Sequence, residues 1–80
     1  MNEQDIILQL NTIVRNIFDD DSIVLTADTT AEDVDGWDSM KHINIVVAAE
    51  GQFGVRFLTS EIELLRNVGD FVTLISRKIK

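Results

Sequence analysis

Apolar residues recur every three or four positions along most of the chain, which is the spacing of amphipathic helices. The pattern predicts a first helix over 5–18 and a second that starts at 38 or 39 and runs to about 53. A short third helix is expected over 59–65, where Ser60 and Glu63 have the spacing of a capping box. A last helix opens at Gly69 and ends in a basic turn. No alternating strand pattern interrupts this order.

The second predicted helix is rich in aliphatic residues. The spacing of its apolar residues predicts a buried stripe formed by Ile43, Val46, Val47 and Phe53, with Met40 near the start. The small residues that follow, Ala48 and Ala49, are candidates for lining a pocket.

Between the first two helices lies a segment, 19–38, in which no long helix is expected. Four short polar residues at 19–22 end the first helix, because their side chains compete for backbone hydrogen bonds. Thr30 and Asp33 have the spacing to cap a short helical turn, and Val34 and Trp37 are apolar anchors. An ordered loop of this length in a small domain is usually functional. The predicted fold is an all-α four-helix bundle, with three longer helices, a short third helix and a long loop between helices 1 and 2.

Size and composition limit what such a bundle can do. The 80 residues, 45% of them hydrophobic, fit one globular domain, 1–80. The sequence has no cysteine and one histidine, His42, which argues against a zinc site and against a Ser/His catalytic pair. Acids at 3 and 5 and the lack of a long apolar run predict a cytoplasmic protein without a signal or membrane segment. We expect no metal site, no enzymatic activity and a monomer.

The negative charge is concentrated in one place. The formal net charge is −7, and the segment 19–38 contains eight acidic residues and no lysine or arginine. A field of this sign repels nucleic acids and anionic membranes and favours basic protein surfaces. The sequence therefore predicts protein partners and no nucleic-acid or membrane binding.

The sequence Gly-Trp-Asp-Ser-Met at 36–40 joins the acidic loop to the second helix. An Asp-Ser pair before a helix is, taken alone, most simply an N-cap. Here, however, the loop would leave the hydroxyl of Ser39 exposed beside unpaired backbone N–H groups, where a phosphate ester is favoured. No His or Lys adjoins Ser39 in the sequence to act as a base, so Ser39 is expected to be modified rather than catalytic.

Residues 33–40, followed by Ile43, Val46, Glu50 and the Phe-Gly-Val-x-Phe exit at 53–57, resemble the acyl carrier protein family and the related peptidyl carrier proteins. The similarity covers essentially the whole chain. It implies that a magnesium-dependent phosphopantetheinyl transferase attaches 4′-phosphopantetheine from coenzyme A to Ser39. The thiol of that group would carry an acyl or aminoacyl cargo as a thioester and present it to partner enzymes. Asp38 and Met40 would flank the attachment site, and Met40 stands where the family usually has Leu.

The family resemblance also implies a docking surface on the second helix, for which Trp37, Lys41, His42 and Glu50 are the candidates. Taken by themselves, Trp37 is better explained as a packing anchor for the loop, and His42 as a solvated helix residue, than as partner contacts. Fatty-acid carriers are strongly acidic in this helix, whereas here Lys41 and Asn44 replace acids. This departure predicts a carrier of a specialised fatty-acid or polyketide-like pathway. The alternatives are a peptidyl carrier and, from another class, an acidic module that binds a partner non-covalently.

Overall fold

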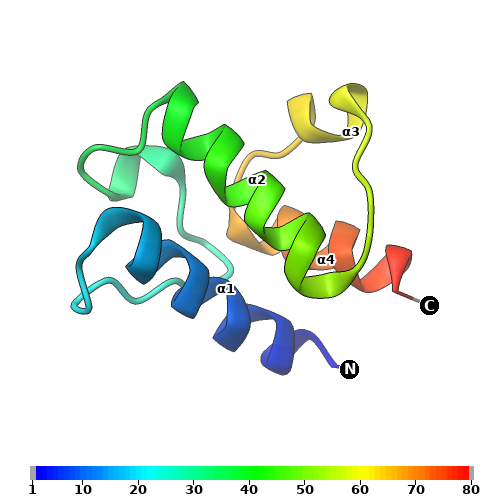
Figure 1. Cartoon of the computed structure of the whole chain (residues 1–80), viewed down its shortest axis with the longest axis horizontal. Helices are drawn as coiled ribbons and strands as arrows, with labels where there is room; N and C mark the ends of the chain where they lie inside the picture. Colours follow the sequence, from blue (N-terminus) through cyan, green and yellow to red (C-terminus); the bar gives the residue numbers. More distant parts are fainter. Residues whose placement is uncertain (1, 80) are drawn as a thin grey trace.

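The computed structural model describes residues 2–79, which form an all-α structure of four helices and a short 3-10 turn, as the sequence predicts (Figure 1). The elements are α1 (Glu3–Phe18), η1 (Ala31–Asp33), α2 (Ser39–Phe53), α3 (Thr59–Glu63) and α4 (Val68–Lys78). In Figure 1, α1 and α2 run in opposite directions, and the loop 19–38 lies at the end of the bundle away from both termini. We refer to this segment as the acidic loop.

The ends of α1 follow from its flanking polar residues. The carboxamide of Asn2 accepts a hydrogen bond from the Asp5 amide at 2.9 Å, so the helix starts two residues earlier than predicted. Asp19 ends the helix in the left-handed conformation, with φ of 52°. Short polar residues such as Asp tolerate this conformation better than branched ones. The prediction that the Asp run terminates α1 is therefore confirmed.

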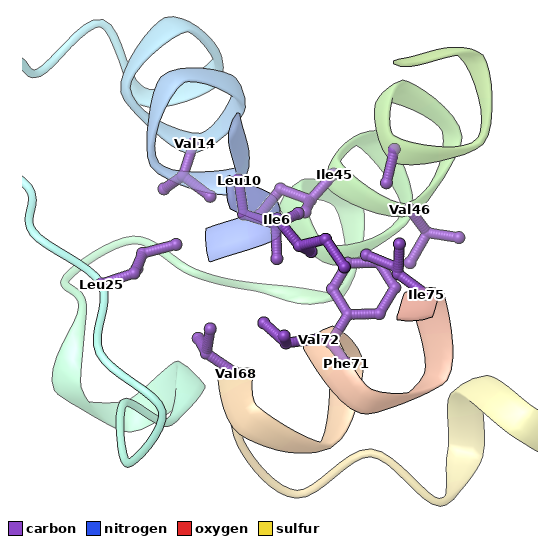
Figure 2. Packing of buried hydrophobic residues seen from close by; sticks show 11 residues of the cluster. Ile6, Leu10, Val14, Leu25, Ile45, Val46, Val68, Phe71, Val72 and Ile75 are labelled. Atoms are coloured by element: carbon purple, nitrogen blue, oxygen red, sulfur yellow. The ribbon is translucent and has the colours of Figure 1, made fainter. Parts of the chain in front are cut away.

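α1 forms the centre of the core because it packs against both α2 and α4. Figure 2 shows side chains from all three helices and the acidic loop converging on one cluster. The buried apolar residues are Ile6, Leu10, Val14, Leu25, Ile45, Val46, Ala49, Val68, Phe71, Val72 and Ile75.

The prediction for the buried stripe of α2 is partly wrong. Val46 is buried, but Ile43 and Val47 point to solvent, with 60% and 59% of their surface exposed. Their places in the core are taken by Ile45 and Ala49, which are 2% and 0% exposed. Apolar residues occur at helical spacing in two phases of α2, so periodicity alone could not decide which phase faces the core.

Polar side chains of α1 fix the start of the acidic loop. The carboxamide of Asn11, which is buried, accepts from the Leu25 amide at 2.7 Å and donates to the Leu25 carbonyl at 3.4 Å. Further along α1, the guanidinium of Arg15 donates to the Ile23 carbonyl at 2.6 Å. Because the loop has no regular secondary structure here, its backbone groups need hydrogen-bond partners from elsewhere, and these side chains supply them. The same bonds hold Leu25 in the core.

The middle of the acidic loop is tied to the start of α4. The amides of Val68 and Gly69 donate to the carbonyls of Thr29 and Ala27, both at 2.8 Å. A side chain at position 69 would begin 2.9 Å from the Ala27 oxygen, so this close approach requires glycine. The loop is therefore ordered, as its apolar anchors predict, and the predicted short turn is present as η1.

α3 begins at Thr59, as predicted, but it ends at Glu63, two residues earlier than expected, and its cap differs from the prediction. Ser60 lies inside α3 and does not cap it; instead the carboxylate of Glu61 accepts from the Leu58 amide at 2.8 Å. That hydrogen bond and, secondarily, Lys78 hold the pKa of Glu61 below its usual value. α4 begins one residue earlier than predicted because the side chain of Asn67 caps it, accepting from the amide of Asp70.

Candidate functional site

Ser39 is the first residue of α2 and is exposed, at the point where the acidic loop ends. Its hydroxyl has no hydrogen-bond partner among residues 2–79. The first amides of a helix have no partner within the helix, and they carry the positive end of the helix dipole. The geometry therefore combines an accessible hydroxyl with an environment that favours a negatively charged substituent.

Asp38 fixes this arrangement by capping α2. Its carboxylate accepts from the Lys41 amide at 2.8 Å, and its carbonyl accepts from the His42 amide at 2.9 Å. Asp38 is exposed, so its carboxylate also faces solvent beside Ser39. The next residue, Met40, is exposed as well, with 71% of its surface accessible. The three residues predicted for the attachment site thus lie together at the surface.

Trp37 and His42 join the end of the acidic loop to α2. The indole N–H of Trp37 donates to Nδ1 of His42 at 3.3 Å, and the Trp37 ring lies 5.9 Å from the Phe18 ring of α1. An indole nitrogen can only donate, so Nδ1 of His42 is the acceptor and the neutral ring carries its proton on Nε2. The sequence did not indicate this bond, although the two residues lie five positions apart.

The charged residues of α2 also make contacts within the protein. The ammonium of Lys41 donates to the Ile17 carbonyl at 3.3 Å and lies 5.4 Å from the centre of the Phe18 ring. The carboxylate of Glu50 accepts from the Phe57 amide at 2.9 Å. All four residues predicted to dock partners, Trp37, Lys41, His42 and Glu50, are half-buried. Their docking role stays a prediction.

A small cavity of about 70 Å³ lies under the Trp37–His42 pair. The residues that line it include Ile45 of α2, Leu65 between α3 and α4, and Phe71 of α4. Neither Ala48 nor Ala49, the pair singled out from the sequence, lines this cavity, and Ala49 is packed in the core.

The described residues, 2–79, contain neither clustered metal ligands nor a membrane-spanning helix. No group of three or more His, Asp or Glu side chains in this part of the chain is placed to hold a metal ion. Within the same range, no helix has the length and apolar character needed to cross a bilayer.

The comparisons with known proteins bear on the whole fold. No family model and no curated protein matches the sequence. Among solved structures, the chain is similar to a holo acyl carrier protein from Geobacter metallireducens, determined by solution NMR. The two share 44% sequence identity over 91% of this chain and 84% of that chain, with a TM-score of 0.86. The chain belongs to the acyl carrier protein family. Membership of this family confirms the resemblance drawn from residues 33–57 and accounts for the carrier-like order of helices.

Proposed function

We propose that this carrier protein holds an acyl group on 4′-phosphopantetheine attached to the Oγ atom of Ser39. The observation that carries the proposal is the exposed Ser39 hydroxyl at the start of α2, in a chain similar to a holo acyl carrier protein. The holo form implies a covalent phosphopantetheine. When attached, this group supplies the thiol that the cysteine-free sequence lacks, and that thiol binds the cargo as a thioester.

The attachment step requires little of the chain itself. The Ser39 hydroxyl loses its proton, an Oγ–P bond forms to the phosphopantetheinyl group of coenzyme A, and adenosine 3′,5′-bisphosphate leaves. The backbone amides at the start of α2 would stabilise the ester phosphate, because they have no partner within the helix and carry partial positive charge. Asp38 holds these amides in place by its cap and offers a carboxylate to the magnesium ion of the transferase.

The proposal is tested by measuring intact mass. We expect a broad-specificity phosphopantetheinyl transferase, with coenzyme A and magnesium, to add one phosphopantetheinyl unit to the wild type and none to Ser39→Ala. Ser60→Ala is the matched control, because Ser60 is also exposed but lies inside α3. An unmodified wild type, or a Ser39→Ala variant that is still modified, would contradict the proposal.

Within this function, we propose an acyl carrier of a specialised fatty-acid or polyketide-like pathway, acting in the cytoplasm with separate acyl-transferring enzymes and without catalytic activity of its own. The support is the lack of exposed acids on α2, which weakens recognition by enzymes with basic docking grooves. Loading by a fatty-acid malonyl transferase should therefore be slower than for a primary fatty-acid carrier. Equal rates at physiological salt would contradict this assignment.

Two other functions remain distinguishable by experiment. A peptidyl carrier is favoured by the same low acidity of α2; it would accept an activated amino acid from an adenylating enzyme instead of an acyl group. A non-covalent acidic module would bind a basic partner through the acidic loop and would stay unmodified in the mass experiment. A Ser39 hydrolase is disfavoured, because Nδ1 of His42 already accepts from Trp37 and the neutral ring has no second acceptor for the serine.

A further inference from the structure

Two hollows of the surface have the Trp37–His42 pair in their walls. One is the small cavity of about 70 Å³, and the other is an open groove that is lined by Ser39 and, from α3, by Glu63. Because Trp37 and His42 line both hollows, their side chains form the boundary between them. We call the second hollow the Ser39 groove.

A side-chain hydrogen bond joins the two halves of this boundary. Trp37 belongs to the acidic loop and His42 to α2, and the indole N–H donates to Nδ1 of His42 at 3.3 Å. The backbone is held independently, because the Trp37 amide donates to the Val34 carbonyl and the His42 amide to the Asp38 carbonyl. A change at the imidazole therefore acts on the two side chains and leaves the backbone in place.

The hydrogen bond exists only while His42 is neutral. Histidine is the side chain that ordinarily changes charge between about pH 5 and 8. The indole nitrogen can donate but not accept, and both nitrogens of a protonated imidazole are donors. Protonation of Nδ1 sets two N–H groups against each other and removes the acceptor of Trp37, so it breaks the contact.

Two carboxylates line the Ser39 groove together with His42, that of Asp38 from the acidic loop and that of Glu63 from α3. Both residues are exposed. A positively charged imidazole is attracted to these acids, whereas the cavity on the other side of the pair is lined mainly by apolar side chains. We therefore expect a protonated His42 ring to turn toward the groove.

The cations near His42 are bound by other groups. The ammonium of Lys41, the preceding residue of α2, donates to the Ile17 carbonyl at 3.3 Å. Arg66 lines the cavity, and its guanidinium donates to the Asp70 carboxylate at 3.0 Å. Because each cation already has a partner, the two carboxylates of the groove determine the direction in which a protonated ring turns.

We infer that the Trp37–His42 pair is a pH-sensitive gate between the cavity and the Ser39 groove. While His42 is neutral, its hydrogen bond to the indole closes the boundary between the two hollows. When His42 gains a proton, the bond is lost, the imidazole turns toward the groove and the indole is released. The gate needs neither the Ser39 hydroxyl nor a group attached to it, so the inference does not depend on the proposed function.

The experiment follows Trp37 and His42 separately in the unmodified chain. The sequence has one tryptophan and one histidine, so fluorescence reports on the indole and proton NMR of the imidazole reports on its charge. Between about pH 8 and about pH 5, the emission should shift to longer wavelength, because the released indole gains contact with water. The midpoint of this shift should coincide with the midpoint of the His42 titration. A constant emission wavelength, or midpoints that differ, would overturn the inference.

His42→Asn is the matched variant, because its Oδ1 atom replaces Nδ1 as the acceptor for the indole but gains no proton in this range. Its emission should equal that of the neutral wild type at every pH. His42→Leu has no acceptor and should emit at the longer wavelength throughout. Circular dichroism checks that both variants are folded, and the wild-type measurement stands without them. The same pH-dependent shift in His42→Asn as in the wild type would assign the response to the carboxylates and overturn the gate.

Discussion

α1 and α2 lie against each other in the core but distribute their apolar residues differently. Nearly all apolar residues of α1 face inward, and Leu8 is its one large apolar side chain exposed within the described residues. α2 buries Ile45, Val46 and Ala49 and still exposes Met40, Ile43 and Val47. α1 therefore places nearly all of its apolar residues against the core, whereas α2 also exposes three large apolar side chains beside Ser39.

The difference indicates separate constraints on the two helices. A single apolar stripe is sufficient for a helix that only has to fold, and additional exposed apolar residues add an aggregation risk without adding stability. In α2 these exposed residues are concentrated along one side of the helix, next to Ser39, the proposed modification site. The polar residues of the two helices also bind different partners. In α1, Asn11 and Arg15 hold the acidic loop. In α2, Lys41 donates to the Ile17 carbonyl of α1, and Glu50 accepts from the Phe57 amide.

The largest expected effect tests which side of α2 faces the core. Ile45→Ala should lower the free energy of unfolding by about 3 kcal/mol, because it removes a buried side chain and enlarges the cavity that Ile45 already lines. Ile43→Ala removes the same atoms from an exposed position and should change it by less than about 0.5 kcal/mol. Urea denaturation measures both values. Similar losses in the two variants would mean that α2 is rotated relative to the structure described.

These two isoleucines also show how far the sequence could predict the molecule. The bounds of α2, the order of helices, the ordered loop and the place of Ser39 follow from caps, spacing and loop composition. The orientation of α2 does not, because apolar residues occupy two helical phases and only packing against α1 and α4 selects one. The role of Asn11 could not be predicted from the sequence either. A polar residue within an amphipathic helix is normally expected to face solvent, and Asn11 instead binds Leu25, fourteen positions away.

The next effect concerns the polar contact that α1 makes with the acidic loop. Asn11→Ala should lower the free energy of unfolding by about 2 kcal/mol, since it leaves the buried amide and carbonyl of Leu25 without partners. Amide hydrogen exchange at Leu25 should accelerate at the same time. Asn16→Ala, at an exposed position on the same helix, is the control and should change neither quantity. Unchanged exchange at Leu25 would show that Asn11 does not hold the loop.

The smallest effect tests the inward polar side of α2. His42→Leu removes the acceptor for the half-buried indole of Trp37 and should lower the free energy of unfolding by about 1 kcal/mol. Trp37 is the single tryptophan of the chain, so its fluorescence reports on the surroundings of this one indole. Emission should shift to longer wavelength as the ring gains contact with water.

Asn44→Leu makes a comparable polar-to-apolar change on the outward side of α2 and should leave the emission unchanged. Equal shifts in both variants would mean that the fluorescence responds to any change on the helix. The two sides of α2 would then not differ in their contact with Trp37. A shift confined to His42→Leu would show that the inward polar side of α2 anchors the acidic loop. The outward side of α2 would then take no part in holding Trp37 and the end of the acidic loop in place.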